Sequence, residues 1–183
     1  MGALLSSSDA MLSHDDILEI QKTSPFSATE IQRLYQRFRH LDRDHSGAIS
    51  FDEFMRIPEF AMNPLARRIL GAFRQTQDDH SEDVNFKQFV EALSAFSRNA
   101  SRDQKLAFAF RVYDEKCDGV LDDEELYQVL KALAGPNLVE HDLQQLVQQT
   151  FRESGAIDRR LTFDQFRRVL HDYDADSAMT INL

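Results

Sequence analysis

The sequence predicts an all-α protein of four helix–loop–helix units, grouped in two lobes with short paired strands in the loops. Three observations support this prediction. An acidic twelve-residue loop lies between Asp42 and Glu53, a short apolar signature recurs four times, and apolar residues at helical spacing flank each recurrence. With 183 residues, the chain is long enough for two small lobes that each bury a core.

The loop from Asp42 to Glu53 has the residue pattern of an EF-hand calcium site. Side chains with oxygen atoms stand at loop positions 1, 3, 5, 9 and 12, and Gly47 stands at position 6, where the chain must turn sharply. Ca²⁺ takes about six to eight oxygen ligands, and this spacing places them around one point. The predicted ligands are the side chains of Asp42, Asp44, Ser46 and Glu53, the backbone carbonyl of Ala48, and Ser50 directly or through water.

The apolar signature occupies residues 49–54, 84–89, 121–126 and 161–166. In each copy an aliphatic residue is followed, at fixed offsets, by Glu or Gln and then by Phe or Leu. We expect the aliphatic residue to lie in a short strand that pairs with the same strand of a neighbouring unit. We expect the later Phe or Leu to begin the exiting helix and to face the core.

Helices are predicted on both sides of the first loop. The helix before it carries apolar residues at Ile31, Leu34, Tyr35, Phe38 and Leu41. The helix after it is expected to end near Pro58, and Asn63-Pro64 marks the start of the next helix. The polar segment 97–101 separates two pairs of units, and Ser101 is expected to cap a helix that begins at Arg102.

The second pair of units repeats the pattern. Its apolar positions are Leu106, Phe108, Phe110, Val112 and Tyr113 before the third loop, Leu126, Val129, Leu130 and Leu133 after it, and Leu143, Leu146, Val147 and Phe151 before the fourth. Gly135-Pro136-Asn137 is expected to stop the intervening helix. The predicted division is an N-terminal arm over 1–26, EF-hand pairs over 27–97 and 98–171, and a tail over 172–183.

The third loop keeps most of the calcium pattern but has Lys116 at position 3. Its predicted ligands are Asp114, Asp118, the backbone carbonyl of Val120, Asp122 and Glu125. A cation at position 3 removes one ligand and repels Ca²⁺. Two outcomes stay open. In the first, the lysine turns outward, a water molecule takes its place and a weaker site remains; in the second, the loop holds no ion.

The second loop is predicted to be metal-free or very weak, and the fourth to be metal-free. The second loop (77–88) lacks glycine at position 6 and ends on Gln88, whose neutral amide cannot supply two carboxylate oxygens. The fourth (154–165) has Ala156 at position 3, Arg159 and Arg160 at positions 6 and 7, and Gln165 at position 12. Its expected role is to pair its strand with the third loop, so Ca²⁺ is the one cofactor predicted, with one candidate site in each lobe.

Composition favours a binding protein over an enzyme. The net charge of −10 argues against nucleic-acid binding and suits cations or basic partners. A single cysteine, Cys117, excludes an internal disulfide framework and fits a reducing, cytoplasmic compartment. The six histidines lack zinc-ligand spacing, and no phosphate-binding glycine loop or serine-nucleophile motif is present.

The first six residues, Met1 to Ser6, fit the pattern for N-terminal myristoylation, with Gly2 as the acceptor. The alternative is an unmodified tail. One such lipid gives only marginal membrane affinity, and no basic patch lies beside it. The sequence therefore leaves open a peripheral membrane contact for a cytoplasmic protein.

The apolar residues favour one durable partner. The chain has 14 Phe and 5 Met, and a phenylalanine-rich surface is stiffer than the methionine-rich grooves that adapt to many targets. Two lobes of this kind are expected to form a trough for an amphipathic helix. The tail from Tyr173 to Leu183 is a candidate to fill or gate that trough.

Several segments make the chain similar to the calcineurin B branch of the EF-hand proteins. They are Arg37-Phe38 with Leu41-Asp42, then 57–60, 63–65, 84–86, 104–111 and 128–131. The resemblance implies a myristoylated regulatory subunit that clamps a long helix of the calcineurin phosphatase catalytic chain. A sister group, the calcineurin B homologous proteins, looks similar over 12–38 and implies binding to the cytoplasmic tail of a sodium/proton exchanger. The family pattern has four working loops, and this chain departs from it.

Three hypotheses follow from the sequence. The first is a non-catalytic subunit of a calcineurin-type phosphatase, with calcium holding the N-terminal lobe in shape. The second is an adaptor on an exchanger tail. The third is a free calcium sensor or buffer, which would need more working loops than this chain provides.

Overall fold

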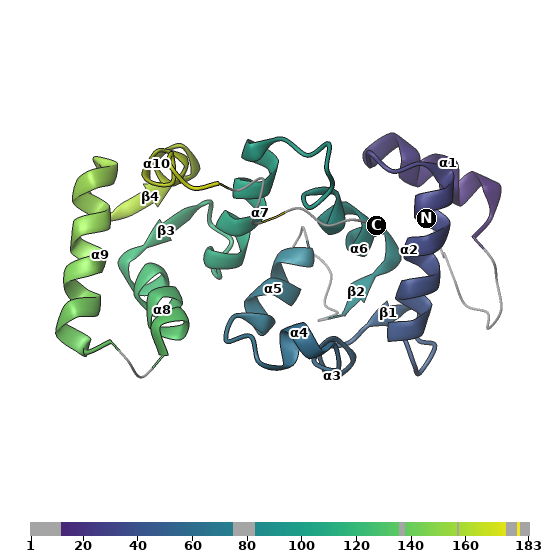
Figure 1. Cartoon of the computed structure of the whole chain (residues 1–183), viewed down its shortest axis with the longest axis horizontal. Helices are drawn as coiled ribbons and strands as arrows, with labels where there is room; N and C mark the ends of the chain where they lie inside the picture. The colour runs from purple at the N-terminus through teal and green to yellow at the C-terminus, as the bar shows by residue number, and fades with distance from the viewer. Residues whose placement is uncertain (1–11, 75–82, 136–137, 157, 175–178, 180–183) are drawn as a thin grey trace.

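Four helix–loop–helix units follow one another along the chain and form two lobes, as the sequence predicts (Figure 1). The computed structural model describes residues 12–74, 83–135, 138–156, 158–174 and 179. Gly2, the first half of the second loop (77–82) and all of the tail beyond residue 174 except Met179 lie outside these ranges. None of the described helices is both long enough and apolar enough to cross a membrane.

The N-terminal lobe comprises α1 (His14–Thr23), α2 (Ala28–Leu41), β1 (Ala48–Ile49), α3 (Phe51–Phe54), α4 (Pro58–Ala61), α5 (Ala66–Phe73), β2 (Val84–Asn85) and α6 (Phe86–Ser94). The first exiting helix ends before Pro58, which is the first residue of the separate short helix α4. The next helix begins at Ala66 rather than at Asn63-Pro64. Asn63 instead forms a turn, because its side-chain oxygen accepts a hydrogen bond from the Leu65 N–H at 2.9 Å.

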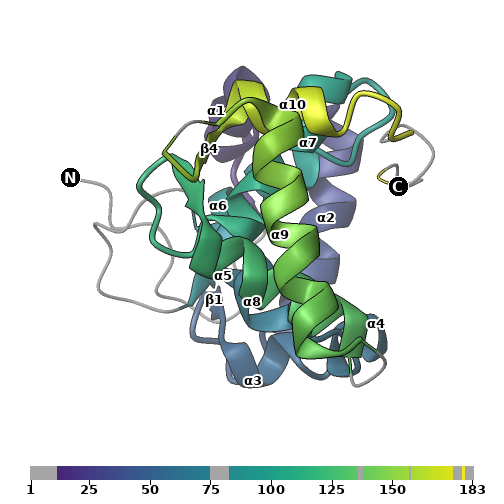
Figure 2. The ribbon, with the colours of Figure 1, turned by 90° about the vertical axis from the view of Figure 1, so that its left-hand side faces the viewer.

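The C-terminal lobe comprises α7 (Arg102–Tyr113), β3 (Val120–Asp122), α8 (Asp123–Ala134), α9 (Glu140–Ser154), β4 (Arg160–Thr162) and α10 (Phe163–Val169). The predicted stop after α8 is confirmed at Gly135, whose φ of 60° an L side chain rarely adopts. Pro136 and Asn137 lie outside the described residues. Figure 2 looks at the molecule from this lobe, with α9 in front.

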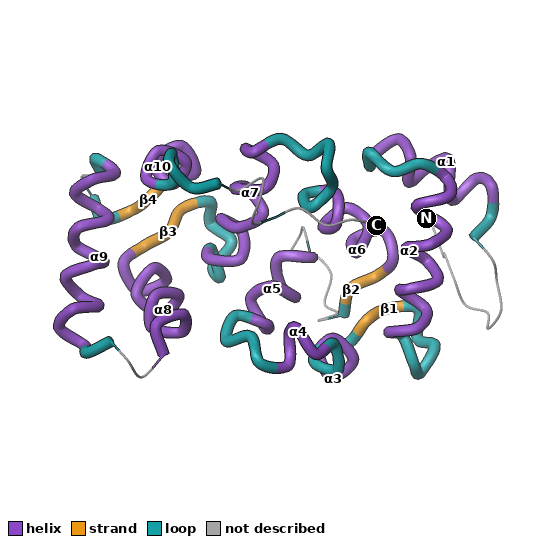
Figure 3. The backbone as a smooth tube through the Cα atoms, viewed as in Figure 1, coloured by secondary structure: helices purple, strands orange, loops and turns teal. Residues whose placement is uncertain are grey.

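Within each lobe the loop strands pair as predicted (Figure 3). Strands β1 and β2 are antiparallel, with Ile49 opposite Val84, and β3 and β4 are antiparallel, with Leu121 opposite Leu161. These four aliphatic residues are buried. The Phe or Leu five residues further on is buried as well in every unit, at Phe54, Phe89, Leu126 and Phe166.

The recurring Glu or Gln of the signature has a structural role in all four units. The side chain at loop position 9 caps the exiting helix, and the side-chain oxygen at position 12 accepts a hydrogen bond from the backbone N–H of that cap, which is the capping-box arrangement. The pairs are Ser50 with Glu53, Asn85 with Gln88, Asp122 with Glu125 and Thr162 with Gln165. A neutral glutamine therefore preserves the fold at a position where a metal site needs a carboxylate.

Helix α7 joins the two lobes through its phenylalanines. On one side Phe108 meets Phe96 edge-on, with ring centroids 4.8 Å apart, and also contacts Phe73 of α5. From the same helix Phe110 contacts Phe163 and Phe166 in the C-terminal lobe. The predicted N-terminal arm contains α1, a helix that the sequence analysis did not assign, and its Ile17 and Ile20 are buried in the N-terminal core.

The predicted cap at Ser101 is confirmed, because its hydroxyl accepts a hydrogen bond from the Gln104 N–H at 3.2 Å. Replacing Ser101 with Ala leaves that N–H without its partner. We expect the free energy of unfolding to fall by about 1 kcal/mol in urea denaturation. Ser94→Ala is the control, because the Ser94 hydroxyl only donates to the Val90 carbonyl, and its effect should stay within about 0.5 kcal/mol. Equal losses from both variants would contradict the capping role.

Candidate metal centre

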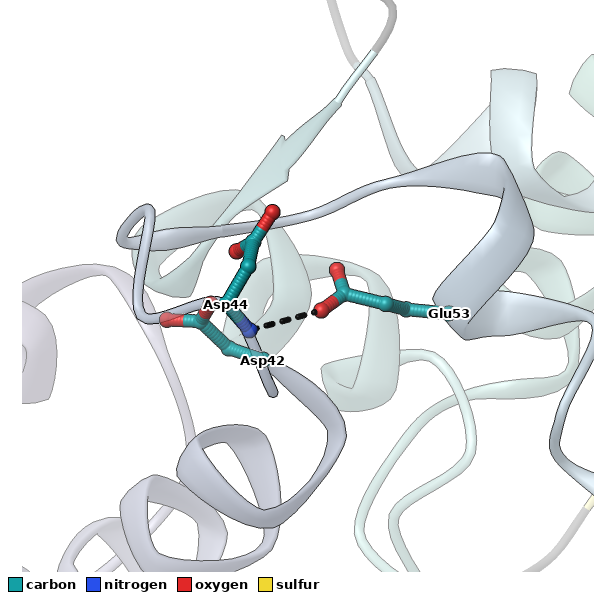
Figure 4. Close-up of side chains that lie close together, drawn as sticks. All are labelled: Asp42, Asp44 and Glu53. Atoms are coloured by element: carbon teal, nitrogen blue, oxygen red, sulfur yellow. Dashed lines mark hydrogen bonds between the residues drawn. The ribbon is translucent and has the colours of Figure 1, made fainter.

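The first loop brings carboxylates together from the end of one helix and the start of the next. Asp42 is the C-terminal cap of α2, and Glu53 lies in the first turn of α3. Together with Asp44 they offer carboxylate oxygens that lie within 4.8 Å of one another (Figure 4). Asp42 and Glu53 are each only 5% exposed, whereas Asp44 is open to solvent. Buried carboxylates are costly without a cation, so this arrangement suits a metal ion.

The other predicted ligands lie beside these carboxylates. The Ser46 hydroxyl is 3.0 Å from the Ala48 carbonyl oxygen and 3.4 Å from Oδ1 of Asp42. The Ser50 hydroxyl donates to Oε2 of Glu53 at 2.9 Å. The structure thus gathers all six predicted groups of the first loop, which together offer the hard oxygen donors that Ca²⁺ prefers.

Backbone N–H groups hold the carboxylates in place. His45 and Gly47 have φ values of 59° and 86°, and this left-handed course turns the loop around Asp42. The N–H groups of Ser46 and Gly47 each donate to Asp42 at 3.0 Å. Glu53 accepts from the N–H of Arg43 at 2.7 Å. The backbone of the loop therefore fixes the positions of both buried carboxylates.

The surroundings raise the pKa of Asp42 and lower the pKa values of Asp44 and Glu53. Burial raises the pKa of Asp42, with hydrogen bonds from Gly47 and Ser46 opposing it. Burial also acts to raise the pKa of Glu53, but the hydrogen bonds from Ser50, Arg43 and Asp44 together outweigh it and the pKa is lowered. Hydrogen bonds from Ser46 lower the pKa of Asp44. A bound cation would relieve the penalty on Asp42 by neutralising its charge.

The third loop has the same backbone course as the first. Cys117 and Gly119 have φ values of 53° and 80°, at the loop positions of His45 and Gly47. Asp114, Asp118 and Glu125 also offer carboxylate oxygens within 4.8 Å of one another. As in the first loop, the carboxylates at positions 1 and 12 are buried and the third one is exposed.

The third loop differs from the first in the cations around it. The Lys116 ammonium contacts the carboxylate of Asp122, a predicted ligand, instead of turning away from the loop. From β4 the Arg160 guanidinium reaches Asp118 at 2.8 Å, and the neighbouring Arg159 reaches Asp123 at 3.0 Å. The predicted carbonyl donor Val120 lies in β3, and its N–H donates to Asp118 at 3.2 Å.

The structure describes the second loop only from residue 83 onward and the fourth loop except for residue 157. Residues 77–82 of the second loop lie outside the described ranges, and Gln88 at its end acts in the helix cap. In the described part of the fourth loop no cluster of metal-binding side chains is found. There the Ser154 hydroxyl donates to the Phe151 carbonyl at 2.8 Å, and Arg159 has a φ of 57°.

A groove of about 700 Å³ lies beside the first loop in the N-terminal lobe. Its walls come from helices α2 to α6, and its apolar side chains include Phe54, Ile57, Phe60, Phe73, Phe89 and Leu93. One edge is basic, because Arg33, Arg37 and His40 lie on the same face of α2 and are exposed. The sequence predicts a trough formed by both lobes, whereas the residues that line this groove belong to the N-terminal lobe, and its basic edge is not part of that prediction. Arg33, Arg37 and His40 are spaced four and then three residues apart, and this helical spacing indicates in the sequence that they share one face.

Comparison with known proteins identifies EF-hand domains over the first and third loops. An EF-hand domain model matches residues 33–62, and an EF-hand domain pair model matches residues 80–133. The calcineurin B subunit of Naegleria gruberi is 40% identical over 180 residues, which cover 98% of this chain and 100% of that protein. The type 1 calcineurin B subunit of Dictyostelium discoideum is 35% identical, over 94% of this chain and 96% of that protein.

The calcineurin B subunit of Candida glabrata is 42% identical over 85% of this chain and 88% of that protein. Identity at this level over nearly the whole length confirms the resemblance found in the sequence. The chain therefore belongs to the calcineurin B family of calcium-binding EF-hand proteins.

Proposed function

We propose that the chain is a calcium-binding regulatory subunit that clamps an amphipathic helix of a calcineurin-type phosphatase catalytic chain. The observation that carries this proposal is the apolar groove, whose lining residues Leu41 and Phe54 directly flank the candidate calcium loop. Relatives named as calcineurin subunits support a phosphatase as the partner. The cytoplasmic location and the lipid on Gly2 stay predictions from the sequence.

We assign the resident ion to the first loop, with Asp42, Asp44, Ser46, Ala48, Ser50 and Glu53 as its ligands. When bound, Ca²⁺ would neutralise the carboxylates and link the end of α2 to the start of α3. The protein supplies the loop shape through the hydrogen bonds to Asp42 and Glu53.

Helices α2 and α3, which flank the first loop, also line the groove. Leu41 and Phe54 both line the groove, and Leu41 directly precedes Asp42 whereas Phe54 directly follows Glu53. Phe54 stacks on Phe60 of α4, with ring centroids 4.2 Å apart. Fixing Asp42 relative to Glu53 therefore fixes two walls of the groove relative to each other.

The edge of the groove favours a partner helix with acidic residues beside its apolar face. Arg33, Arg37 and His40 are exposed along α2 although the chain as a whole carries a net charge of −10. Complementary charge at an interface rim mainly sets orientation and association rate. The apolar walls would supply most of the affinity.

Substituting Ile57 with Glu tests the clamp, because it places a charge on a half-buried wall of the groove. We expect the affinity for the catalytic chain from the same genome to fall at least about 30-fold, since losing a central apolar contact costs about 2 kcal/mol or more. Calorimetry of the purified chains measures the affinity, and circular dichroism checks the fold.

Met62→Glu is the matched control, because Met62 is 90% exposed and does not line the groove. It should bind the catalytic chain as the unmodified protein does. Undiminished binding by Ile57→Glu would reject the groove as the docking site. Stable binding of an exchanger tail in place of any phosphatase chain would favour the adaptor hypothesis instead.

A further inference from the structure

We propose that two basic side chains of the protein itself take the place of the ion in the third loop, so that the C-terminal pair of units keeps its folded form without calcium. The two are Lys116, which contacts Asp122, and Arg160, which reaches Asp118 at 2.8 Å. Each carries one positive charge, so together they match the charge of one Ca²⁺. This proposal does not depend on the identity of the partner.

The backbone N–H groups hold the carboxylates at positions 1 and 12 of the third loop as they do in the first loop, and the third loop adds basic side chains to this pattern. Both oxygens of Asp114 accept backbone N–H groups, from Asp118 at 3.1 Å and from Gly119 at 2.9 Å. Both oxygens of Glu125 do the same, from Lys116 at 2.9 Å and from Asp122 at 3.2 Å. The two carboxylates nearer to solvent, Asp118 and Asp122, receive the basic side chains.

The cations come from different parts of the fold. Lys116 belongs to the third loop, whereas Arg160 lies in β4, at the register position opposite Asp122 in β3. A further contact comes from α5 in the N-terminal lobe, where Arg68 pairs with Glu115 at 2.6 Å and donates to the Tyr113 carbonyl at 3.0 Å. The Arg68 side chain is 15% exposed and that of Glu115 is 61% exposed, so this pair lies at the surface with its arginine partly covered.

The first loop differs in the charges that reach its carboxylates. Among the described residues, no salt bridge joins a basic side chain to Asp42, Asp44 or Glu53. The two loops share their backbone course and the burial of their carboxylates at positions 1 and 12. The difference between them is therefore the charge brought by Lys116 and Arg160.

An ion entering the third loop would meet three obstacles together. It would lack an oxygen at position 3, it would be repelled by the ammonium group that stands there, and it would have to displace Arg160 from Asp118. Exposed ion pairs are individually weak, so the exclusion depends on all three acting at once. The residues as they stand do not fit a resident Ca²⁺, and we infer that this lobe is a permanent structural support.

The test converts the third loop back toward a metal site in the full chain, by combining Lys116→Asp with Arg160→Thr. The first change restores an oxygen at position 3, and the second frees the Asp118 carboxylate. Calorimetric titration with Ca²⁺ should give one ion per chain for the unmodified protein and two for the double variant. Lys131→Asp with Arg152→Thr makes the same change in net charge away from the loop and should leave the count at one.

Hydrogen exchange of α9 and α10 provides a readout independent of stoichiometry. Protection should be the same with Ca²⁺ and with a chelator in the unmodified protein, and it should depend on Ca²⁺ in the double variant. If the double variant does not fold, the milder substitution Lys116→Asn can be tested alone. The Lys116→Asn protein should also bind a second Ca²⁺, with lower affinity than the first. Two ions of similar affinity in the unmodified chain, or a folded variant that still binds one, would overturn the proposal.

Discussion

Glu53→Gln is expected to weaken calcium binding at least about 100-fold. Glu53 is the residue that can offer two carboxylate oxygens at position 12, and even residues that only orient a metal ligand typically cost about 10–100-fold when they are removed. The fold should survive, because Gln88 and Gln165 make the same helix cap in the second and fourth loops, each accepting a backbone N–H at 2.9 Å. Isothermal titration calorimetry measures the change.

Glu125→Gln is the matched control for this experiment. It alters position 12 of the third loop, where Glu125 is also buried and also belongs to a capping box. Because we place the ion in the first loop, this variant should bind Ca²⁺ with the affinity of the unmodified chain. A large loss of calcium affinity in Glu125→Gln, with no loss in Glu53→Gln, would show that the main site lies in the C-terminal lobe.

Phe38→Ala is expected to lower the free energy of unfolding by about 3–5 kcal/mol, the usual cost of emptying a buried aromatic site. Phe38 is 2% exposed and meets Phe86 and Phe89 edge-on, with ring centroids 5.3 and 5.6 Å away. Its carbonyl accepts a hydrogen bond from the Asp42 N–H at 2.9 Å, so loosening this turn should weaken calcium binding too. Urea denaturation measures the stability.

Tyr173→Ala removes an aromatic ring that is 45% exposed and serves as the comparison for Phe38→Ala. Its effect should stay within about 0.5 kcal/mol. A loss below about 1 kcal/mol in Phe38→Ala would show that the N-terminal core can close over the missing ring, and the proposed link between this core and the loop would then fail.

The repeated architecture could be predicted because each unit carries its own local signals. The aliphatic residue, the Glu or Gln and the following Phe or Leu stand at fixed offsets in all four copies, and the Glu or Gln caps a helix within its own unit. The cap at Ser101 and the stop at Gly135 are local for the same reason. Helix α1 has a similar cap, in which Ser13 is followed by Asp16. Asp16 stands where the usual capping box has Glu or Gln, so the sequence pattern does not predict this helix.

The contacts that distinguish the two loops could not be predicted, because they depend on tertiary structure. Arg160 reaches Asp118 only through the antiparallel register of β3 and β4, and Arg68 reaches Glu115 only because α5 packs against α7. The sequence places Lys116 in the third loop but not the carboxylate that it contacts. The groove combines residues of five helices, so its apolar walls come together only in the folded lobe, whereas its three basic residues share one face of α2.

The most direct test of the central claim is a crystal structure of the protein grown with saturating Ca²⁺. We predict one ion in the first loop, about 2.3–2.6 Å from oxygens of Asp42, Asp44, Ser46, Ala48 and Glu53. A first loop that holds no ion under these conditions would contradict the claim that calcium links α2 to α3 at this site.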